Sequence, residues 1–207
     1  MRNYIDITGF ILGWFSIIGQ FYLAIENRQA EVTETVIRFF SYFTVLTNLL
    51  VVLYFTSRIS LFKKTQISKL SNKEALTAIT AFILVVGLIY QFILRSTWKP
   101  TGFQMIINEL LHSVIPLFVL LYWIQFGEKN NLQFKNIKIW LWYPIGYLLF
   151  IIIRGHFSGF YPYPFVDVTT IGYQQVLINS VLISLFFLFI MGTLIFIGNK
   201  TNKSELS

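Results

Sequence analysis

The stretch QMIINELLHSVIPLFVLLYWIQF, residues 104–126, is long and apolar enough to cross a membrane as one helix. At about 1.5 Å of rise per residue, roughly 20 residues span a hydrocarbon core about 30 Å thick. The same stretch carries Asn108, Glu109 and His112 within two helical turns, with Pro116 one turn further on. Ionisable side chains at membrane depth are costly, so they normally face a bundle interior or a wet cavity. The segment therefore predicts a membrane span with a polar site inside it.

Apolar runs of similar length recur along the whole chain. Of the 207 residues, 56% are hydrophobic and only 12% are charged, a proportion that a soluble domain of this size does not need. We therefore predict an all-α integral membrane protein, a single domain (1–207) that forms a bundle of six transmembrane helices. The first run has no small-residue cleavage site after it, so it is expected to be retained rather than removed as a signal peptide. The expected helices span approximately residues 4–25, 35–57, 75–95, 104–127, 138–158 and 173–198.

The net charge of +7 is distributed unevenly between the two predicted sides of the membrane. With six spans, both termini and two of the loops lie on one side. That side holds Arg2, Arg58, Lys63, Lys64, Lys69, Lys73, Lys129, Lys135, Lys138, Lys200 and Lys203. The opposite side holds Arg28, Arg38, Arg95, Lys99 and Arg154. The positive-inside rule places both termini in the cytoplasm, which in a microbe means the cytoplasmic membrane.

The basic residues indicate lipid contact and not a nucleic-acid partner. The loop RISLFKKTQISKLSNKE, residues 58–74, is expected to meet anionic lipid headgroups on the cytoplasmic side. For most of these charges, setting the topology is a sufficient explanation.

The polar residues of the predicted spans fall in one layer, in the outer half of the membrane, with Thr47 and Asn48 near its middle. A through-channel would spread such residues along the full depth. We therefore predict an enclosed polar cavity that opens toward the outer face and is closed toward the cytoplasm by packed apolar side chains. The residues of this layer are Gln20, Arg38, Ser41, Thr44, Thr47, Asn48, Gln91, Arg95, Asn108, Glu109, His112, Arg154, His156, Asn179 and Ser180.

The second span contains the candidate nucleophiles. In RFFSYFTVLTNLL, which begins at Arg38, the residues Arg38, Ser41, Thr44 and Asn48 follow one another at steps of three, three and four. On one continuous helix they share a face, with Thr47 beside them. A lone threonine in a membrane helix normally bonds a carbonyl one turn earlier. The aligned polar stripe argues for a functional role instead.

The fourth span contains the candidate base. His112 lies four residues after Asn108 and three after Glu109, so either side chain can orient the imidazole, as a general base requires. Pro116 has no N–H for the His112 carbonyl, so we expect a kink there that gives the ring room to move. The alternative is a histidine that serves only helix packing.

The fifth span ends in RGHFSGFYPYPF, from Arg154 onward. Arg154 is expected either to hold an anionic headgroup or to pair with Glu109, and His156 is either a second site residue or an interfacial histidine. The tyrosines and prolines suit an interfacial loop with an aromatic belt. His112, His156 and Glu109 offer three zinc ligands, but no close spacing such as HExxH supports that site and the chain has no cysteine. We expect no metal and no cofactor.

The sequence resembles a family of six-helix membrane proteins, the androgen-induced and androgen-dependent proteins. Three segments carry the resemblance: NELLHSVIP, with one residue fewer between His and Pro than in the family; GYLLFIIIRGHFSGFYPYPF, with its GY, Gly and closing YP; and SYFTVLTNLL. Members of the family are threonine hydrolases of fatty-acid esters of hydroxy fatty acids. The resemblance covers nearly the whole chain as short motifs and implies a lipid-ester hydrolase.

The resemblance assigns His112 as the catalytic histidine and Thr44 as the nucleophile. The second span has one extra residue compared with the family, so aligning on the aromatic gives Thr44 whereas aligning on Asn48 gives Val45, which has no hydroxyl. Thr47 therefore stays open as an alternative nucleophile.

We accordingly predict ester hydrolysis by Thr44 and His112, with Asn108 or Glu109 orienting the histidine and Asn48 or Ser41 stabilising the oxyanion. Thr47 and Arg38 are further supporting candidates. His156, Arg154, Asn179 and Gln91 are candidate pocket residues. The expected partner is a membrane lipid or fatty ester.

Two other classes of function remain open from sequence. A small-molecule or proton-coupled transporter would use Glu109, His112 and Arg154 as a proton relay. A non-enzymatic lipid-binding protein would need the cavity but no nucleophile.

Overall fold

The computed structural model describes residues 2–59, 68 and 70–204, and every regular element within them is a helix. The α-helices are α1 (Arg2–Glu26), α2 (Val32–Phe39), α3 (Phe43–Arg58), α4 (Lys73–Ile89), α5 (Gly102–Glu109), α6 (Ile115–Phe126), α7 (Phe134–Ile137), α8 (Trp142–Ser158) and α9 (Val168–Ser204). Two π-helical segments, Tyr90–Leu94 and Leu110–Val114, and two 3₁₀ segments, Lys138–Leu141 and Pro164–Val166, complete the set. The all-α prediction is confirmed for these residues.

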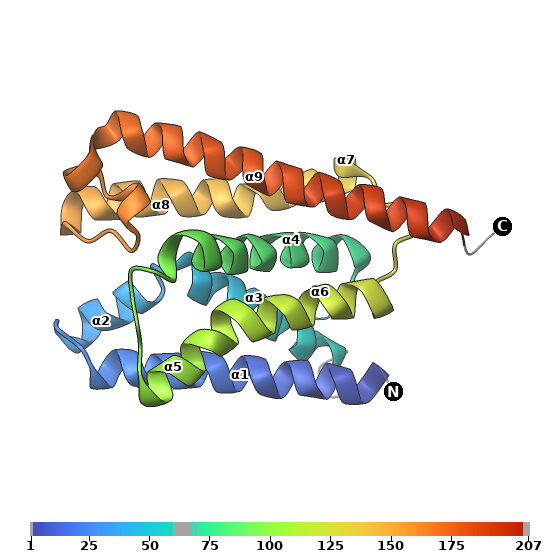
Figure 1. Ribbon diagram of the computed structural model, residues 1–207, viewed down its shortest axis with the longest axis horizontal. Coiled ribbons are helices and arrows are strands. Elements are labelled where there is room, and N and C mark those ends of the chain that lie inside the picture. The colour runs from blue at the N-terminus through green and yellow to red at the C-terminus, as the bar shows by residue number, and fades with distance from the viewer. Residues whose placement is uncertain (1, 60–67, 69, 205–207) are drawn as a thin grey trace.

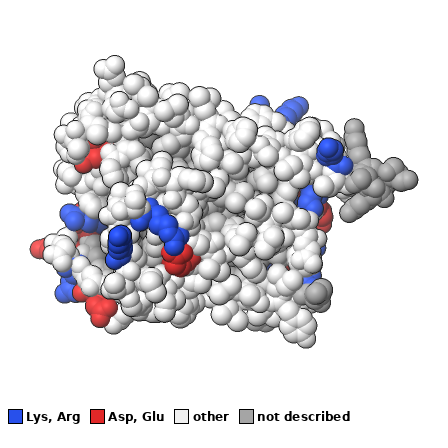
Figure 2. All heavy atoms as spheres, viewed as in Figure 1, with Lys and Arg blue, Asp and Glu red and all other residues white. Residues whose placement is uncertain are grey.

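Within the described part of the chain, five helical segments are long and apolar enough to cross a membrane, and a sixth is obtained if α2 and α3 together form one bent span. This agrees with an integral membrane protein. The N-terminus of α1 and the C-terminus of α9 lie at the same end of the bundle (Figure 1). On the face drawn in Figure 2, charged side chains gather toward the two ends and leave a broad uncharged belt between them. The side that faces the cytoplasm stays a prediction, and Lys63, Lys64 and Lys69 lie outside the described residues.

Helix α4 lies near the centre of the bundle, where it packs against α3, α6 and α9 (Figure 1). Its small residues, among them Ala78, Ala81 and Gly87, let neighbouring helices approach closely, as is common between membrane helices. A Cβ atom on Gly87 would lie 3.2 Å from the His112 carbonyl oxygen, so α4 passes directly behind that turn. Thr77 accepts a hydrogen bond from the Trp123 indole at 3.0 Å. The centre of the bundle therefore fixes the backbone around His112.

The second span differs from the prediction of one continuous helix over 35–57. Helix α2 ends at Phe39, α3 begins at Phe43, and the two are bent by 69°. The bend leaves the Ser41 carbonyl without a helical partner, and the Tyr147 hydroxyl of α8 donates to it at 2.9 Å. The Ser41 hydroxyl donates to the Ile37 carbonyl at 2.7 Å. The predicted four-residue stripe of this span was therefore wrong, because Arg38 lies on α2, Ser41 lies in the break, and Thr44 and Asn48 lie on the differently directed α3.

The fourth span is distorted one turn before the proline. Residues Leu110–Val114 form a π-helical turn, and Pro116 lies in the first turn of α6 directly after it. In a π turn a backbone carbonyl accepts from the N–H five residues later instead of four. Carbonyls before Pro116 can therefore bond other residues than the proline, which has no N–H. A local widening of the helix thus lies one turn before Pro116, where the sequence predicted a kink, and His112 is at its centre.

Candidate functional site

A cavity of about 530 Å³ opens at the end of the bundle that carries α2 and the loop between α8 and α9. We call it the polar cavity, because charged and amide side chains, among them Arg28, Arg38, Gln104 and Asn108, contribute to its lining. Its wall is supplied by α1, α2, α3, the two π-helical segments, α5 and that loop. The residues used below that line it are Arg38, Tyr42, Thr44, Tyr90, Asn108, His112, Phe160 and Tyr163.

A second, smaller cavity of about 80 Å³ lies between α4, α8 and α9. We call it the apolar cavity, because most of its lining is hydrocarbon: Val85, Val86, Ile89, Leu148, Ile183 and Phe187. Thr44, His112, Tyr163 and Leu94 line both cavities. These residues are therefore the boundary at which a polar space and an apolar space meet.

Thr44 owes its position to the break between α2 and α3. It is the second residue of α3, so its backbone N–H has no acceptor within the helix. The Tyr163 hydroxyl accepts this N–H at 3.2 Å and lies 3.3 Å from the Thr44 Oγ1. Most buried hydroxyls of the bundle, such as those of Ser16 and Thr80, instead donate to a carbonyl four residues earlier. Because α3 starts at Phe43, Thr44 has no preceding helical turn whose carbonyl its hydroxyl could bond. Its hydroxyl lies at the cavities instead.

Thr47, the alternative nucleophile, has different surroundings. Its side chain is fully buried, and its Oγ1 lies 2.9 Å from the Tyr143 hydroxyl of α8. It lines neither cavity. The structure therefore brings Thr44, and not Thr47, to the same surface as His112.

The imidazole of His112 is held from two sides. Its Nδ1 lies 2.9 Å from the backbone carbonyl oxygen of Asn108. A carbonyl only accepts hydrogen bonds, so in the neutral ring Nδ1 carries the proton and Nε2 has a free lone pair. The ring stacks on Tyr90 with centroids 4.2 Å apart and planes 24° apart. The Tyr90 hydroxyl in turn accepts from the Asn108 side-chain amide at 2.6 Å.

This arrangement differs from the expected orientation by a side chain of Asn108 or Glu109. The backbone of Asn108 holds the ring, and its side chain holds Tyr90. The Glu109 carboxylate forms an ion pair with Arg95 at 2.7 Å and accepts from Ser113 at 2.6 Å, so it does not orient the imidazole. Thr44 and His112 do not hydrogen bond to each other in this structure, because the Thr44 hydroxyl contacts Tyr163.

Asn48 links the turn that carries Thr44 to the turn that carries His112. Its side chain has no exposed surface, and its Nδ2 donates to the Thr44 carbonyl at 2.9 Å and to the Leu111 carbonyl at 3.3 Å. One amide thus joins the first turn of α3 to the residue before His112. Its role is positional, since it does not line either cavity.

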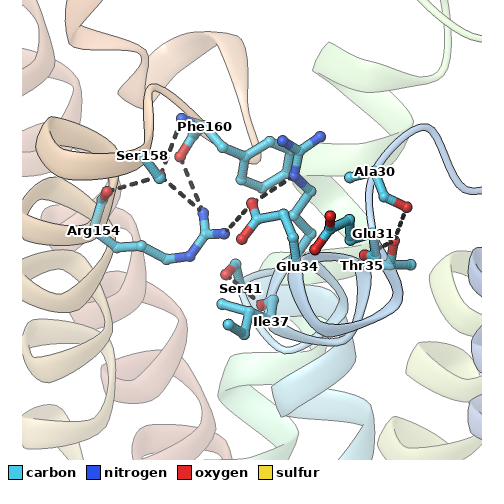
Figure 3. A network of polar contacts seen from close by, with 10 residues as sticks. Ala30, Glu31, Glu34, Thr35, Ile37, Ser41, Arg154, Ser158 and Phe160 are labelled. Carbon is cyan, nitrogen blue, oxygen red and sulfur yellow. Dashed lines mark hydrogen bonds and ion pairs between the residues drawn. The ribbon is translucent and has the colours of Figure 1, made fainter.

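Three charged residues link α2 to the end of α8 at the rim of the polar cavity (Figure 3). The Glu34 Oε1 lies 2.7 Å from the Arg38 Nε and 2.7 Å from the Arg154 Nη2. The ring of Phe160 lies beside both guanidinium groups, with centroid distances of 4.6 and 5.0 Å. Arg154 therefore pairs with Glu34 and not with Glu109, and only 10% of its side-chain surface is left for a headgroup.

The remaining predicted site residues lie outside both cavities. Gln91 donates to the Ser113 hydroxyl at 2.8 Å, and Asn179 donates to the Phe165 carbonyl at 2.9 Å. His156 lies 3.3 Å from the Tyr173 hydroxyl on an exposed surface. Among the described residues, no three His, Asp or Glu side chains approach closely enough to hold a metal ion. The zinc site weighed from the sequence therefore has no geometric basis in this part of the chain.

No protein-family model, curated protein sequence or solved structure matches this chain. The interpretation of the site therefore depends on its own residues. Two of them, Tyr90 and Tyr163, were not predicted. Tyr90 carried no sequence signal beyond its place in an apolar run, and the YPYPF stretch that contains Tyr163 was interpreted as an interfacial belt.

Proposed function

We propose that this protein is an intramembrane lipid-ester hydrolase that uses Thr44 as nucleophile and His112 as general base. The observation that carries the proposal is the position of these two residues at the boundary between the polar and the apolar cavity. A fatty ester has the same division, because a hydrocarbon chain and a polar alcohol part meet at its carbonyl. The resemblance to the threonine hydrolases assigns the same two residues.

In the proposed first half of the reaction, the Thr44 Oγ1 attacks the ester carbonyl carbon while the His112 Nε2 takes the hydroxyl proton. The tetrahedral intermediate then breaks the bond to the alcohol oxygen, which receives that proton from His112. The alcohol leaves through the polar cavity, and the acyl group stays on Thr44 with its chain in the apolar cavity.

In the second half, the His112 Nε2 takes a proton from water, and the resulting hydroxide attacks the acyl carbon. The bond to Thr44 breaks, the Thr44 oxygen recovers its proton from His112, and the fatty acid is released. The Nδ1–H contact with the Asn108 carbonyl supports this role, because it leaves Nε2 as the basic nitrogen in both halves.

The proposal is tested by locating the covalent intermediate. The purified protein in detergent or nanodiscs is treated with a fluorophosphonate bearing a long alkyl chain, digested, and analysed by mass spectrometry. We expect one adduct, on Thr44. An adduct on another residue, or ester hydrolysis without any adduct, contradicts the assignment.

The apolar cavity is expected to set the preference for acyl chains. Ile183→Trp should fill it and lower the hydrolysis rate of long-chain esters by about tenfold or more, with little effect on short-chain esters, since each methylene group in an apolar pocket contributes about 1–3 kcal/mol. The measurement is kcat/KM for p-nitrophenyl esters of increasing chain length.

Ile178→Trp is the matched control, because Ile178 lies on the same helix and 45% of its surface is exposed. It should leave the chain-length profile unchanged. An equal effect of both substitutions would assign the acyl chain to another surface.

A further inference from the structure

The hydroxyl of Tyr163 contacts two atoms of the proposed nucleophile, Thr44. It accepts the Thr44 backbone N–H at 3.2 Å and lies 3.3 Å from the Thr44 Oγ1. Tyr163 lies in the loop between α8 and α9, 119 positions away in the chain, and lines both cavities. No other described side chain is hydrogen-bonded to the Thr44 hydroxyl.

We infer that Tyr163 is a third catalytic residue, whose hydroxyl and the Thr44 backbone N–H together bind the oxyanion of the tetrahedral intermediate. The inference rests on the proposed hydrolase function. A phenol has one proton to donate and can accept at the same time. Because its oxygen accepts the Thr44 N–H, its own proton is free to point toward the nucleophile and the attacked carbonyl.

The distances from the Tyr163 hydroxyl to the Thr44 N and Oγ1 atoms are typical of weak hydrogen bonds, which can break when the substrate carbonyl oxygen takes their place. Both exceed the usual separation of about 2.9 Å for N–H···O and about 2.7 Å for O–H···O hydrogen bonds. A carbonyl oxygen that becomes negatively charged offers both donors a stronger, charge-assisted partner. The partial positive charge at the N-terminus of α3 also stabilises the oxyanion, since Thr44 lies in the first turn of this helix.

Packing of the aromatic ring holds the hydroxyl in place. The Tyr163 ring stacks on Phe165 with centroids 5.1 Å apart and planes 5° apart, and it meets Tyr42 edge to face at 5.8 Å. Close by, Gly155 of α8 has no Cβ, which leaves room for the ring of Tyr161. A donor fixed before the reaction begins stabilises a developing charge without reorganisation.

Hydrogen bonds to two carbonyls anchor the loop itself. Arg154 donates to the Phe160 carbonyl at 3.4 Å, and Asn179 donates to the Phe165 carbonyl at 2.9 Å. These two residues, predicted as pocket residues, therefore position the loop that carries Tyr163. Burial raises the pKa of Tyr163 to about 12, so the hydroxyl keeps its proton at neutral pH.

The test is Tyr163→Phe, which keeps the ring and its packing but removes the hydroxyl. We expect kcat for a long-chain p-nitrophenyl ester to fall by about 10² to 10³, the usual effect of removing one oxyanion donor, with KM nearly unchanged. Affinity for a long-chain trifluoromethyl ketone, which forms an oxyanion on Thr44, should fall by a similar factor. A merely structural role would not separate kcat from KM in this way.

Tyr143→Phe is the matched control, because it removes the other tyrosine hydroxyl that contacts a threonine of α3. It should change kcat by less than about twofold, as expected of a group that touches no reacting atom. A wild-type adduct on Thr44 together with unchanged kcat in Tyr163→Phe overturns the inference and leaves the proposed function standing. Absence of the Thr44 adduct in the wild-type protein overturns the proposed function itself.

A second substitution addresses any loss of folding in Tyr163→Phe. Incorporation of 3,5-difluorotyrosine at position 163 keeps the shape of the side chain and lowers the pKa of its hydroxyl. The donor proton is then lost at a lower pH, so hydrolysis should decline on the alkaline side well before that of the wild-type protein. Identical pH profiles for the two proteins would contradict a donating role for this hydroxyl.

Discussion

A Thr44→Val variant is expected to lose ester hydrolysis by about 10³-fold or more and to lose covalent labelling by a fluorophosphonate. Valine keeps the shape of threonine but has no oxygen to form the acyl-enzyme, and loss of a nucleophile removes the covalent route entirely. The side chain lies at the boundary of both cavities and its hydroxyl is not bonded to a helix carbonyl. The variant should therefore fold normally. Both effects are measured on purified protein by p-nitrophenyl ester turnover and by gel fluorescence of the labelled band.

Thr47→Val is the matched control on the same helix. It should keep hydrolysis within a few-fold of the wild-type rate, because Thr47 lines neither cavity. It should instead lower the stability by about 1–3 kcal/mol, since the buried Tyr143 hydroxyl loses its partner at 2.9 Å. If the two variants exchange these effects, with Thr47→Val inactive and Thr44→Val active, the other threonine is the nucleophile.

The spans were predictable because a membrane imposes a length on any helix that crosses it. The fourth predicted span, 104–127, corresponds to Gly102–Phe126, and the third, 75–95, to Lys73–Leu94. Hydropathy alone sets such limits. The break in the second span was not predictable in this way, because RFFSYF contains no proline or glycine. The freed Ser41 carbonyl is satisfied by Tyr147, a residue more than 100 positions away.

The choice between Thr44 and Thr47 depended on that break. On a continuous helix both hydroxyls would have lain on nearly the same face, so the helical pattern alone did not separate them. Once α3 begins at Phe43, Thr44 falls in its first turn at the cavities, whereas Thr47 packs against α8. The break, where the Tyr147 hydroxyl bonds the Ser41 carbonyl, thus determines which of the two threonines lines the cavities.

The contact of His112 was predicted at the right spacing but with the wrong chemical group. The spacing of Asn108, Glu109 and His112 indicated a side-chain partner one turn earlier, whereas the structure places the Asn108 backbone carbonyl there. The partner is a backbone carbonyl because the helix widens into a π turn at Leu110–Val114, and such turns depend on packing as much as on local sequence. Tyr163 was missed because an aromatic residue beside prolines is also typical of a membrane interface.

Replacement of His112 by alanine is expected to lower kcat by about 10² to 10⁴, the range in which general bases contribute, with KM nearly unchanged. The contacts between Thr44 and Tyr163 do not involve the imidazole, so the nucleophile and the acyl-chain site remain in place. Both acylation and deacylation need the base, and therefore no acyl-enzyme should accumulate. Rapid-quench analysis of the covalent intermediate measures this directly.

Chemical rescue distinguishes loss of the base from loss of the fold. His112→Ala leaves a space beside Tyr90 that is continuous with the polar cavity, so free imidazole can enter and take the place of the missing ring. Added imidazole should restore part of the activity in a saturable way, whereas the same addition should not restore Thr44→Val. Full activity of His112→Ala without imidazole would remove the histidine from the mechanism. Rescue of Thr44→Val to the same extent would show that the imidazole itself cleaves the ester and that the restored activity is not a replacement of His112.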